Sequence, residues 1–238
     1  MREMYHREAN YDNWQSKVYG TSHGTGSYKP SKTSYKGKVR KADVIRTKLG
    51  TNLWMTPKPP FGDHKTVGDY MRWLRSEGVK TIAVLLTDNE LKTMGNLVNV
   101  YEGSGFEVLR YPIRDFNIPT DIAKFDHFLH TLRNRLKRNS IAVHCFGGNG
   151  RTGLVVASML VQMGMDADDA MRFVRKRRPA AIETADQEDF IYDYQKYVEA
   201  YLDMYNEEPQ ENIVEMTQSF MIPGTNIILV KGDKIKIL

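Results

Sequence analysis

The sequence of 238 residues contains one cysteine, Cys145. A single cysteine excludes a disulfide within the chain, argues against a structural zinc site and fits a reducing compartment. Long apolar runs are missing as well: the longest, residues 154–165, is interrupted by Ser158 and Gln162 and is too short to span a bilayer. The first sixteen residues contain no apolar stretch, so we expect no signal peptide. These absences predict a cytoplasmic protein, with the nucleus as the alternative, and no membrane partner.

The sequence also lacks histidines at the spacing that is typical of metal ligands. Five histidines lie outside the segment around Cys145 and are spaced unlike zinc ligands: His6, His23, His64, His127 and His130. We therefore expect neither a metal nor another cofactor.

The positive charge is unevenly distributed. The chain has 34 Lys and Arg against 29 Asp and Glu, but residues 1–41 alone contain nine of the basic and only three of the acidic residues. The rest is close to neutral, which gives little support for a nucleic-acid partner. A short basic run, residues 175–178, ends a predicted helix, where cations complement the helix dipole; binding of an acidic substrate surface is the alternative.

The pattern of the chain predicts three parts. Residues 1–36 are rich in Gly, Ser, Thr, Tyr and Lys without hydrophobic periodicity, which predicts a basic and largely disordered tail. Residues 37–205 are expected to form the folded domain. Residues 206–238 are expected to be an acidic link followed by a β-hairpin of strands 226–230 and 234–238.

Strand and helix patterns alternate through the central part. Apolar runs predict strands at 52–55, 81–86, 106–111 and 140–143, and stripes at helical spacing predict helices near 67–78, 91–101, 122–136, 151–163, 167–174 and 190–202. Such alternation predicts an α/β fold with a central, mostly parallel sheet flanked by helices on both faces. Ligands bind at the carboxyl ends of the strands in sheets of this kind.

Cys145 opens a run that reaches Arg151 six positions later and continues with Thr152. The loop between them consists of Phe146, Gly147, Gly148, Asn149 and Gly150. Its glycines let several backbone N–H groups turn inward on one anion, and the helix that follows adds the attraction of its N-terminus. This field should hold Cys145 as a thiolate, and the planar guanidinium of Arg151 can bind two phosphoryl oxygens. The run predicts a phosphate cradle and nucleophilic attack on a phosphate ester.

Five further residues complete the predicted chemistry. Asp115 follows a strand at the same sheet edge, so it can protonate the leaving group as general acid. Gln187 is expected to orient the water that hydrolyses the phosphocysteine. Thr152 is expected to donate a hydrogen bond to the departing thiolate, and His144 to support the loop without transferring protons. Glu90 is a candidate to brace Arg151.

Of two other phosphate-binding motifs, the dinucleotide-binding motif is disfavoured and the phosphate-loop NTPase motif is excluded. Residues 148–153 fit the glycine pattern of dinucleotide-binding proteins, but the acidic residue expected about twenty positions later at a strand end is missing. A phosphate-loop NTPase requires a lysine before Thr152, where this chain has Arg151.

The run from residue 143 to 152 matches the active-site signature of the cysteine-dependent protein tyrosine phosphatase superfamily. The compact size and the 30 positions between Asp115 and Cys145 resemble its dual-specificity branch. With residues 181–187, the loop looks most like the kinase-associated and mitotic-exit phosphatase group, over about residues 42–205. The resemblance implies a dual-specificity phosphatase fold and these roles: nucleophile Cys145, phosphate-binding Arg151, hydroxyl donor Thr152, general acid Asp115 and water-positioning Gln187.

Two positions depart from the family pattern. Phe116 follows the general acid where the family has glycine, and Glu183 replaces the first glutamine of its Gln-Thr-x-x-Gln motif. The loop that deepens the pocket of strict phosphotyrosine enzymes is not evident. The resemblance therefore implies a shallow pocket that accepts phosphotyrosine and phosphoserine/threonine.

The sequence thus favours a metal-independent phosphoprotein phosphatase that acts through a phosphocysteine. An RNA 5′-triphosphatase is an alternative suggested by the basic tail, although a pyrophosphate leaving group would not need Asp115. A phosphoinositide phosphatase is less favoured because residues 146–150 include no lysine. A phospho-binding module without turnover is disfavoured by the intact nucleophile and acid.

Overall fold

The computed structural model describes residues 42–47, 50–62 and 64–206, together with four short strands between residues 213 and 236. The predicted disordered tail, residues 1–36, lies outside the described residues. Two compact units, one ending at Tyr197 and one beginning at Val198, are considered separately. None of the helices in the described ranges has both the length and the apolar character needed to cross a membrane.

A five-stranded sheet forms the centre of the first unit. Its strands lie in the order β1-β2-β5-β3-β4. The neighbours β2–β5, β5–β3 and β3–β4 are parallel, whereas β1 is antiparallel to β2. The strands are β1 Asp43–Arg46, β2 Asn52–Thr56, β3 Val79–Val84, β4 Glu107–Arg110 and β5 Ser140–His144. The prediction of a mostly parallel sheet is confirmed; the edge strand β1 was not anticipated.

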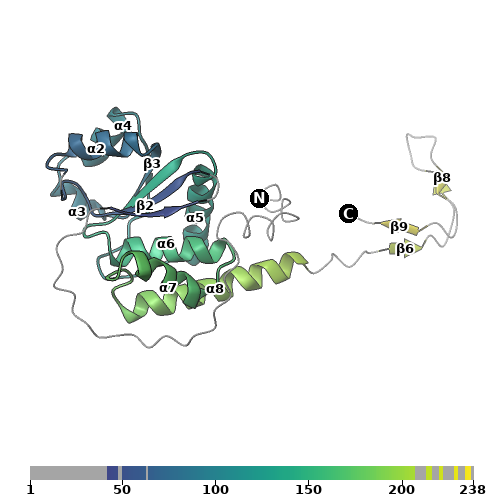
Figure 1. Ribbon diagram of the computed structural model, residues 1–238. Helices are drawn as coiled ribbons and strands as arrows, with labels where there is room; N and C mark the ends of the chain where they lie inside the picture. Colours follow the sequence, from purple (N-terminus) through teal and green to yellow (C-terminus); the bar gives the residue numbers. More distant parts are fainter. Residues whose placement is uncertain are drawn as a thin grey trace. The chain divides into compact units, whose positions relative to one another are not determined.

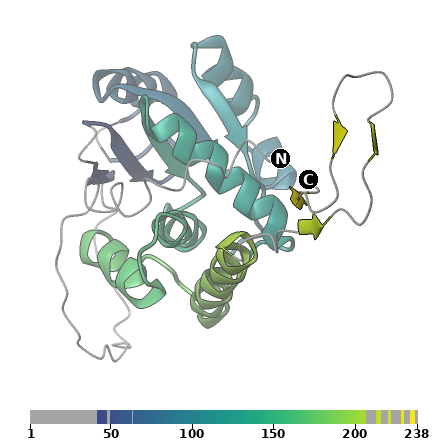
Figure 2. The ribbon, with the colours of Figure 1, turned by 90° about the vertical axis from the view of Figure 1, so that its right-hand side faces the viewer.

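Helices cover both faces of this sheet (Figure 1). On one face α2 contacts β3 and α4 contacts β4, while α5 and α6 pack against β5 on the other. The helices α7 and α8 lie on the outer side of α6 (Figure 2). The helices are α2 Val67–Ser76, α3 Asp88–Lys92, α4 Leu97–Gly103, α5 Ile122–Leu136, α6 Gly150–Gln162, α7 Ala167–Arg177 and α8 Ala185–Asn206. The predicted α/β architecture is therefore confirmed.

The single helix predicted near residues 91–101 is wrong in detail, because the structure has α3 and α4 there. Gly95 lies between them with a φ of 67°, a left-handed conformation that ends a helix. The first of the two helices is fixed by a capping box in which Thr87 and Glu90 bond to each other's backbone amides. That box brings Glu90 to the carboxyl end of β3, near the site described below.

The central helix α6 is buried along its whole length, and every residue of β5 is buried as well. A helix that is apolar all round must be enclosed by other elements, as its sequence predicted. The loop between β5 and α6 thus connects two of the most deeply buried elements of the fold. Its backbone is held at both ends, which suits a site that requires a fixed geometry.

The second unit differs from the predicted hairpin. Strands lie at Ile228–Leu229 (β8) and Lys234–Lys236 (β9), close to the predicted positions, but they do not pair with each other. Instead β9 pairs with Ile213–Glu215 (β6), and β8 pairs with Phe220–Met221 (β7), both antiparallel. The sequence analysis predicted no strand at residues 213–215 or 220–221, and these two segments are the partners that β9 and β8 take.

Candidate active site

The predicted cradle lies at the carboxyl edge of the parallel strands. Thr56 at the end of β2 and Val84 at the end of β3 both pair with His144, the last residue of β5. Cys145 is the next residue, and its side chain is almost fully buried. The backbone N–H of Gly148 lies 3.2 Å from Cys145 Sγ and donates to it. The sulfur and this amide therefore face each other across the turn of the loop.

The cradle closes because Gly148 lacks a side chain. Its φ is 75°, and a Cβ there would stand 2.4 Å from the carbonyl oxygen of Thr56 and 2.5 Å from the nitrogen of Pro57. The loop therefore lies directly on the end of β2. Phe146, the first residue of the loop after the cysteine, instead projects outward and is 51% exposed.

Arg151 lies at the first turn of α6, and its side chain is 1% exposed. Its two terminal nitrogens each donate to one carboxylate oxygen of Glu90 at 2.9 Å, and one of them also donates to the carbonyl of Ile113 at 2.9 Å. Burial opposes the charge of the guanidinium, but Glu90, the Cys145 sulfur and Asp115 outweigh it and raise the pKa of Arg151 above its usual value. The brace expected from Glu90 is confirmed.

The pKa of Glu90 is shifted in the complementary direction. Burial alone would raise it, but the hydrogen bonds from Arg151 and Thr87 lower it below the usual value for a glutamate. Both partners are therefore charged at neutral pH, and the guanidinium is held in one orientation by a bidentate ion pair.

Two buried polar atoms of the cradle have no hydrogen-bond partner among the described residues. These are Nε of Arg151 and Oγ1 of Thr152. Buried donors without partners are rare because each costs about 1–3 kcal/mol. Of the five N–H donors of the Arg151 side chain, Glu90 takes two, Ile113 one and Asp115 one, so that the Nε–H is left over, which fits a site built to receive an oxyanion. The Thr152 hydroxyl likewise has no competing partner for the bond predicted to the thiolate.

The structure brings Asp115 to the same site. Its Oδ1 lies 2.8 Å from a terminal nitrogen of Arg151, although the side chain is 54% exposed. Phe116 follows with a φ of 57° and is 60% exposed. The family has glycine at this position, and the left-handed backbone explains why: the turn requires that conformation even where the residue is phenylalanine.

Gln187 reaches the site from the first turn of α8 and is completely buried. Its Oε1 accepts from the backbone N–H of Glu183 at 2.9 Å, and its Nε2 donates to the carbonyl of Asn117 at 3.2 Å. This side chain therefore ties the acid loop to the segment before α8. The role predicted for it, orienting a water, stays a prediction, since both ends of its amide bond to the protein.

Known proteins share this arrangement. The family model Tc-R-P, described as polymorphic toxin system, DSP-PTPase phosphatase, matches residues 59–165. The rat protein cyclin-dependent kinase inhibitor 3 is 31% identical over 137 residues, which are 54% of this chain and 63% of that protein. The structure of kinase-associated phosphatase with its catalytic cysteine replaced by serine matches with a TM-score of 0.59 at 25% identity, covering 70% of this chain and 99% of that one.

By these matches the chain is similar to the dual-specificity branch of the cysteine-dependent protein tyrosine phosphatases. A second solved structure, Tk-PTP in its active form, matches with a TM-score of 0.54 at 25% identity over 62% of this chain and 94% of that one. The chain spans just under two thirds of the length of the rat relative.

Two arginines of the basic run support the site in a way that the sequence analysis did not predict. Arg178 is 4% exposed; it donates to Asn149 Oδ1 at 2.8 Å, to the carbonyl of Gly147 at 3.2 Å and to Asp43 of β1 at 2.9 Å. It thereby fixes the phosphate loop from behind. The sequence analysis interpreted residues 175–178 as cations that complement a helix end or bind an acidic substrate. Neither interpretation includes this structural role of Arg178.

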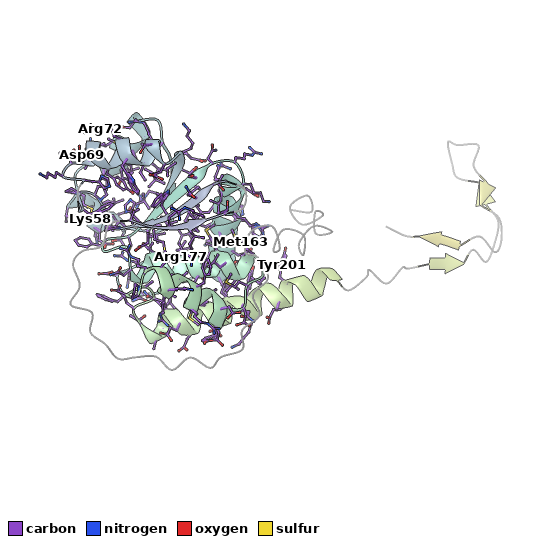
Figure 3. All side chains as sticks on the ribbon, viewed as in Figure 1. Lys58, Asp69, Arg72, Met163, Arg177 and Tyr201 are labelled. Atoms are coloured by element: carbon purple, nitrogen blue, oxygen red, sulfur yellow. The ribbon has the colours of Figure 1, made fainter. Side chains whose placement is uncertain are left out.

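Arg175 acts in the same way on the segment before α8. It donates to the carbonyl of Ala181 at 3.2 Å and to that of Ile182 at 2.9 Å, and it pairs with Glu188. No sequence signal separated these two arginines from their neighbours. Lys58 was also missed: its Nζ lies 4.7 Å from the centre of the Phe146 ring, at the edge of the phosphate loop (Figure 3).

In the described part of the chain, no group of three or more His, Cys, Asp or Glu side chains is arranged to hold a metal ion.

His144 supports the loop from the buried side. It is fully buried; its Nδ1 lies 3.1 Å from the carbonyl oxygen of Cys145, and its Nε2 lies 3.4 Å from the hydroxyl of Tyr101. Because a carbonyl can only accept, Nδ1 carries the proton and Nε2 accepts from the tyrosine. Burial lowers the pKa of His144 to about 4, so the ring is neutral at physiological pH.

This lowered pKa predicts a loss of stability in mild acid. The unfolded chain protonates His144 near pH 6.5, whereas the folded protein resists protonation down to about pH 4. Stability is thus complete above pH 6.5 and declines as the pH falls towards 4, by about 3 kcal/mol in the limit. Denaturant unfolding measures the free energy of unfolding at pH 7 and at pH 5. The difference between these two free energies should be smaller for His144→Gln than for the wild type. His127→Gln, at an exposed position, is the control for removing a histidine; equal differences in all three proteins would contradict the prediction.

Proposed function

We propose that this protein hydrolyses phosphate esters on proteins, at phosphotyrosine and at phosphoserine or phosphothreonine, without a metal ion and through a phosphocysteine. One observation carries the proposal. The Cys145 sulfur accepts an amide hydrogen bond within a glycine-rich loop whose arginine is locked by Glu90 and keeps an unpaired buried Nε. A nucleophile and an oxyanion site are thus built from the same seven residues.

In the first step the Cys145 thiolate attacks phosphorus, and the bond between phosphorus and the ester oxygen breaks. The ester oxygen leaves with the electron pair and takes a proton from Asp115. The Asp115 carboxyl pairs with Arg151 at 2.8 Å in this structure. When the phosphoryl group binds to the guanidinium, it takes over that contact and places Asp115 beside the leaving oxygen, as general acid catalysis requires.

In the second step water attacks the phosphocysteine, and the phosphorus–sulfur bond breaks. Asp115, now ionised, accepts the proton of the water, and inorganic phosphate is formed. The sulfur leaves as a thiolate, to which the Thr152 hydroxyl donates a hydrogen bond. Gln187 holds the acid loop and the segment before α8 together during this step. We propose that the same side chain orients the attacking water.

The substrate is proposed to be a phosphorylated protein in the cytoplasm or the nucleus. Kinase-associated phosphatase, the better fit of the two solved structures described above, is a phosphatase by name, and so is the bovine relative protein tyrosine phosphatase domain-containing protein 1. No membrane or nucleic-acid partner is needed by this chemistry.

A panel of four substrates in the presence of a chelator tests the function. Phosphotyrosine and phosphothreonine peptides should both release phosphate, and a 5′-triphosphorylated RNA and a phosphoinositide should react more slowly. Asp115→Ala should slow the peptide reactions by about a hundredfold or more, because the alkoxide or phenoxide then leaves without its proton. Turnover of RNA ends alone, at equal rates for wild type and Asp115→Ala, would replace the proposal with an RNA 5′-triphosphatase.

A further inference from the structure

A second carboxylate reaches the phosphate loop. Oε2 of Glu183 accepts from the backbone N–H of Gly150 at 2.8 Å. Gly150 belongs to the cradle and is the first residue of α6, where unpaired amides attract anions. The residue before it, Asn149, gives this helix no side-chain cap, since its Oδ1 accepts from Arg178 instead. Glu183 therefore supplies the negative charge at this helix end.

The surrounding chain holds Glu183 in this place. Ile182 has a φ of 60°, a costly conformation for a β-branched residue, of a kind found where function demands it. Two carbonyls before Glu183 accept from Arg175, and its own N–H donates to Gln187. At Gly150, a Cβ would stand 2.5 Å from Glu183 Oε2. The contact between Glu183 and Gly150 thus depends on the strained turn at Ile182, on the hydrogen bonds of Arg175 and Gln187, and on the missing side chain of Gly150.

The amide taken by Glu183 is one that an oxyanion in the cradle would use. A phosphoryl dianion and a carboxylate cannot share one N–H at hydrogen-bond distance, and their like charges repel. The side chain of Glu183 is otherwise exposed, so water can stabilise it when it swings away. A glutamine in its place, as in the family motif, would offer the same shape without the charge.

We propose that Glu183 is an internal competitor for the phosphate loop, which weakens the binding of both the phosphorylated substrate and the phosphate product. The inference rests on the proposed function, because it concerns the affinity of the same cradle. Its consequence is a phosphatase with a higher KM and weaker product inhibition than the same site with a neutral residue at this position.

Calorimetric titration with inorganic phosphate at pH 7 tests the inference on the full chain. Glu183→Gln should bind phosphate about tenfold more tightly than the wild type, the size expected for losing one charge-assisted hydrogen bond and a like charge. Its KM for a phosphotyrosine peptide should fall by a similar factor. Asp186→Asn is the matched control: it removes the same charge from an exposed position three residues further on, and its affinity should stay near that of the wild type.

The possible outcomes distinguish a specific role of Glu183 from an effect of net charge and from a failure of the proposed function. Equal phosphate affinity in all three proteins, or weaker binding by Glu183→Gln, would overturn the role of Glu183. Equal tightening by Asp186→Asn would overturn it too, since the effect would then come from net charge alone. Glu183→Ala removes the same carboxylate and repeats the test if the glutamine variant folds poorly. A wild type that releases no phosphate from any peptide would instead refute the proposed function.

Discussion

Replacing Cys145 with serine should abolish turnover while leaving phosphopeptide binding intact. A serine hydroxyl is not ionised at neutral pH, and His144 is not available as its base, because the two ring nitrogens bond to the Cys145 carbonyl and to Tyr101. We expect kcat to fall by about 10⁴-fold or more, as for other removed nucleophiles. The oxygen can still accept from Gly148, so the cradle should keep its shape.

Two measurements separate this result from simple damage. Phosphate release from a phosphotyrosine peptide reports turnover, and calorimetry with the same peptide reports binding. Loss of turnover with retained binding is the expected pair. Retained turnover in Cys145→Ser would remove the nucleophile from the mechanism. Loss of binding as well would mean that the sulfur is needed for the shape of the loop rather than for attack.

The sequence located the cradle well because its chemistry leaves few choices. An anion nest needs glycines at close backbone approaches, a helix start and a cation at a fixed reach. Those needs restrict the residue types between Cys145 and Arg151, so the run can be recognised from its spacing alone. The position of Asp115 could be inferred as well, because the ends of parallel strands meet at one edge.

The supporting contacts could not be predicted in this way. Arg175 and Arg178 lie in one basic run but hold different loops: Arg175 projects from the last turn of α7, whereas Arg178 follows the end of that helix. The Glu183 contact depends on the backbone of Ile182, whose left-handed conformation no sequence rule assigns to isoleucine. Tertiary packing determines such contacts, and a local sequence pattern does not predict them.

The errors in the element predictions have local causes. A continuous helical pattern near residues 91–101 concealed Gly95, whose left-handed conformation separates α3 from α4. The split matters for the site, since α3 is the helix that carries Glu90 to Arg151. In the second unit, strand positions were nearly right, but their pairing was not, because pairing depends on segments distant in sequence.

Replacing Gly148 with alanine should damage the cradle more than any other small change in the loop. The new Cβ would stand 2.4 Å from the Thr56 carbonyl oxygen, against backbone that cannot rotate away, and the φ of 75° disfavours alanine in addition. We expect a loss of at least about 2 kcal/mol in the free energy of unfolding. Because a displaced loop misplaces both Cys145 and its amide donor, kcat/KM should fall by about a hundredfold or more.

Gly147→Ala is the matched control for this change. A Cβ at Gly147 would meet only the side-chain nitrogen of Asn149, at an ordinary 3.8 Å, and its φ lies outside the left-handed region. The same methyl group one residue earlier should therefore leave denaturant unfolding and peptide hydrolysis close to wild-type values. If both variants lose activity equally, the loop is sensitive to any added side chain, and the close approach to β2 is not what shapes it. If neither variant loses activity, the end of β2 moves to accommodate the methyl group, and the rigidity inferred for the cradle is wrong.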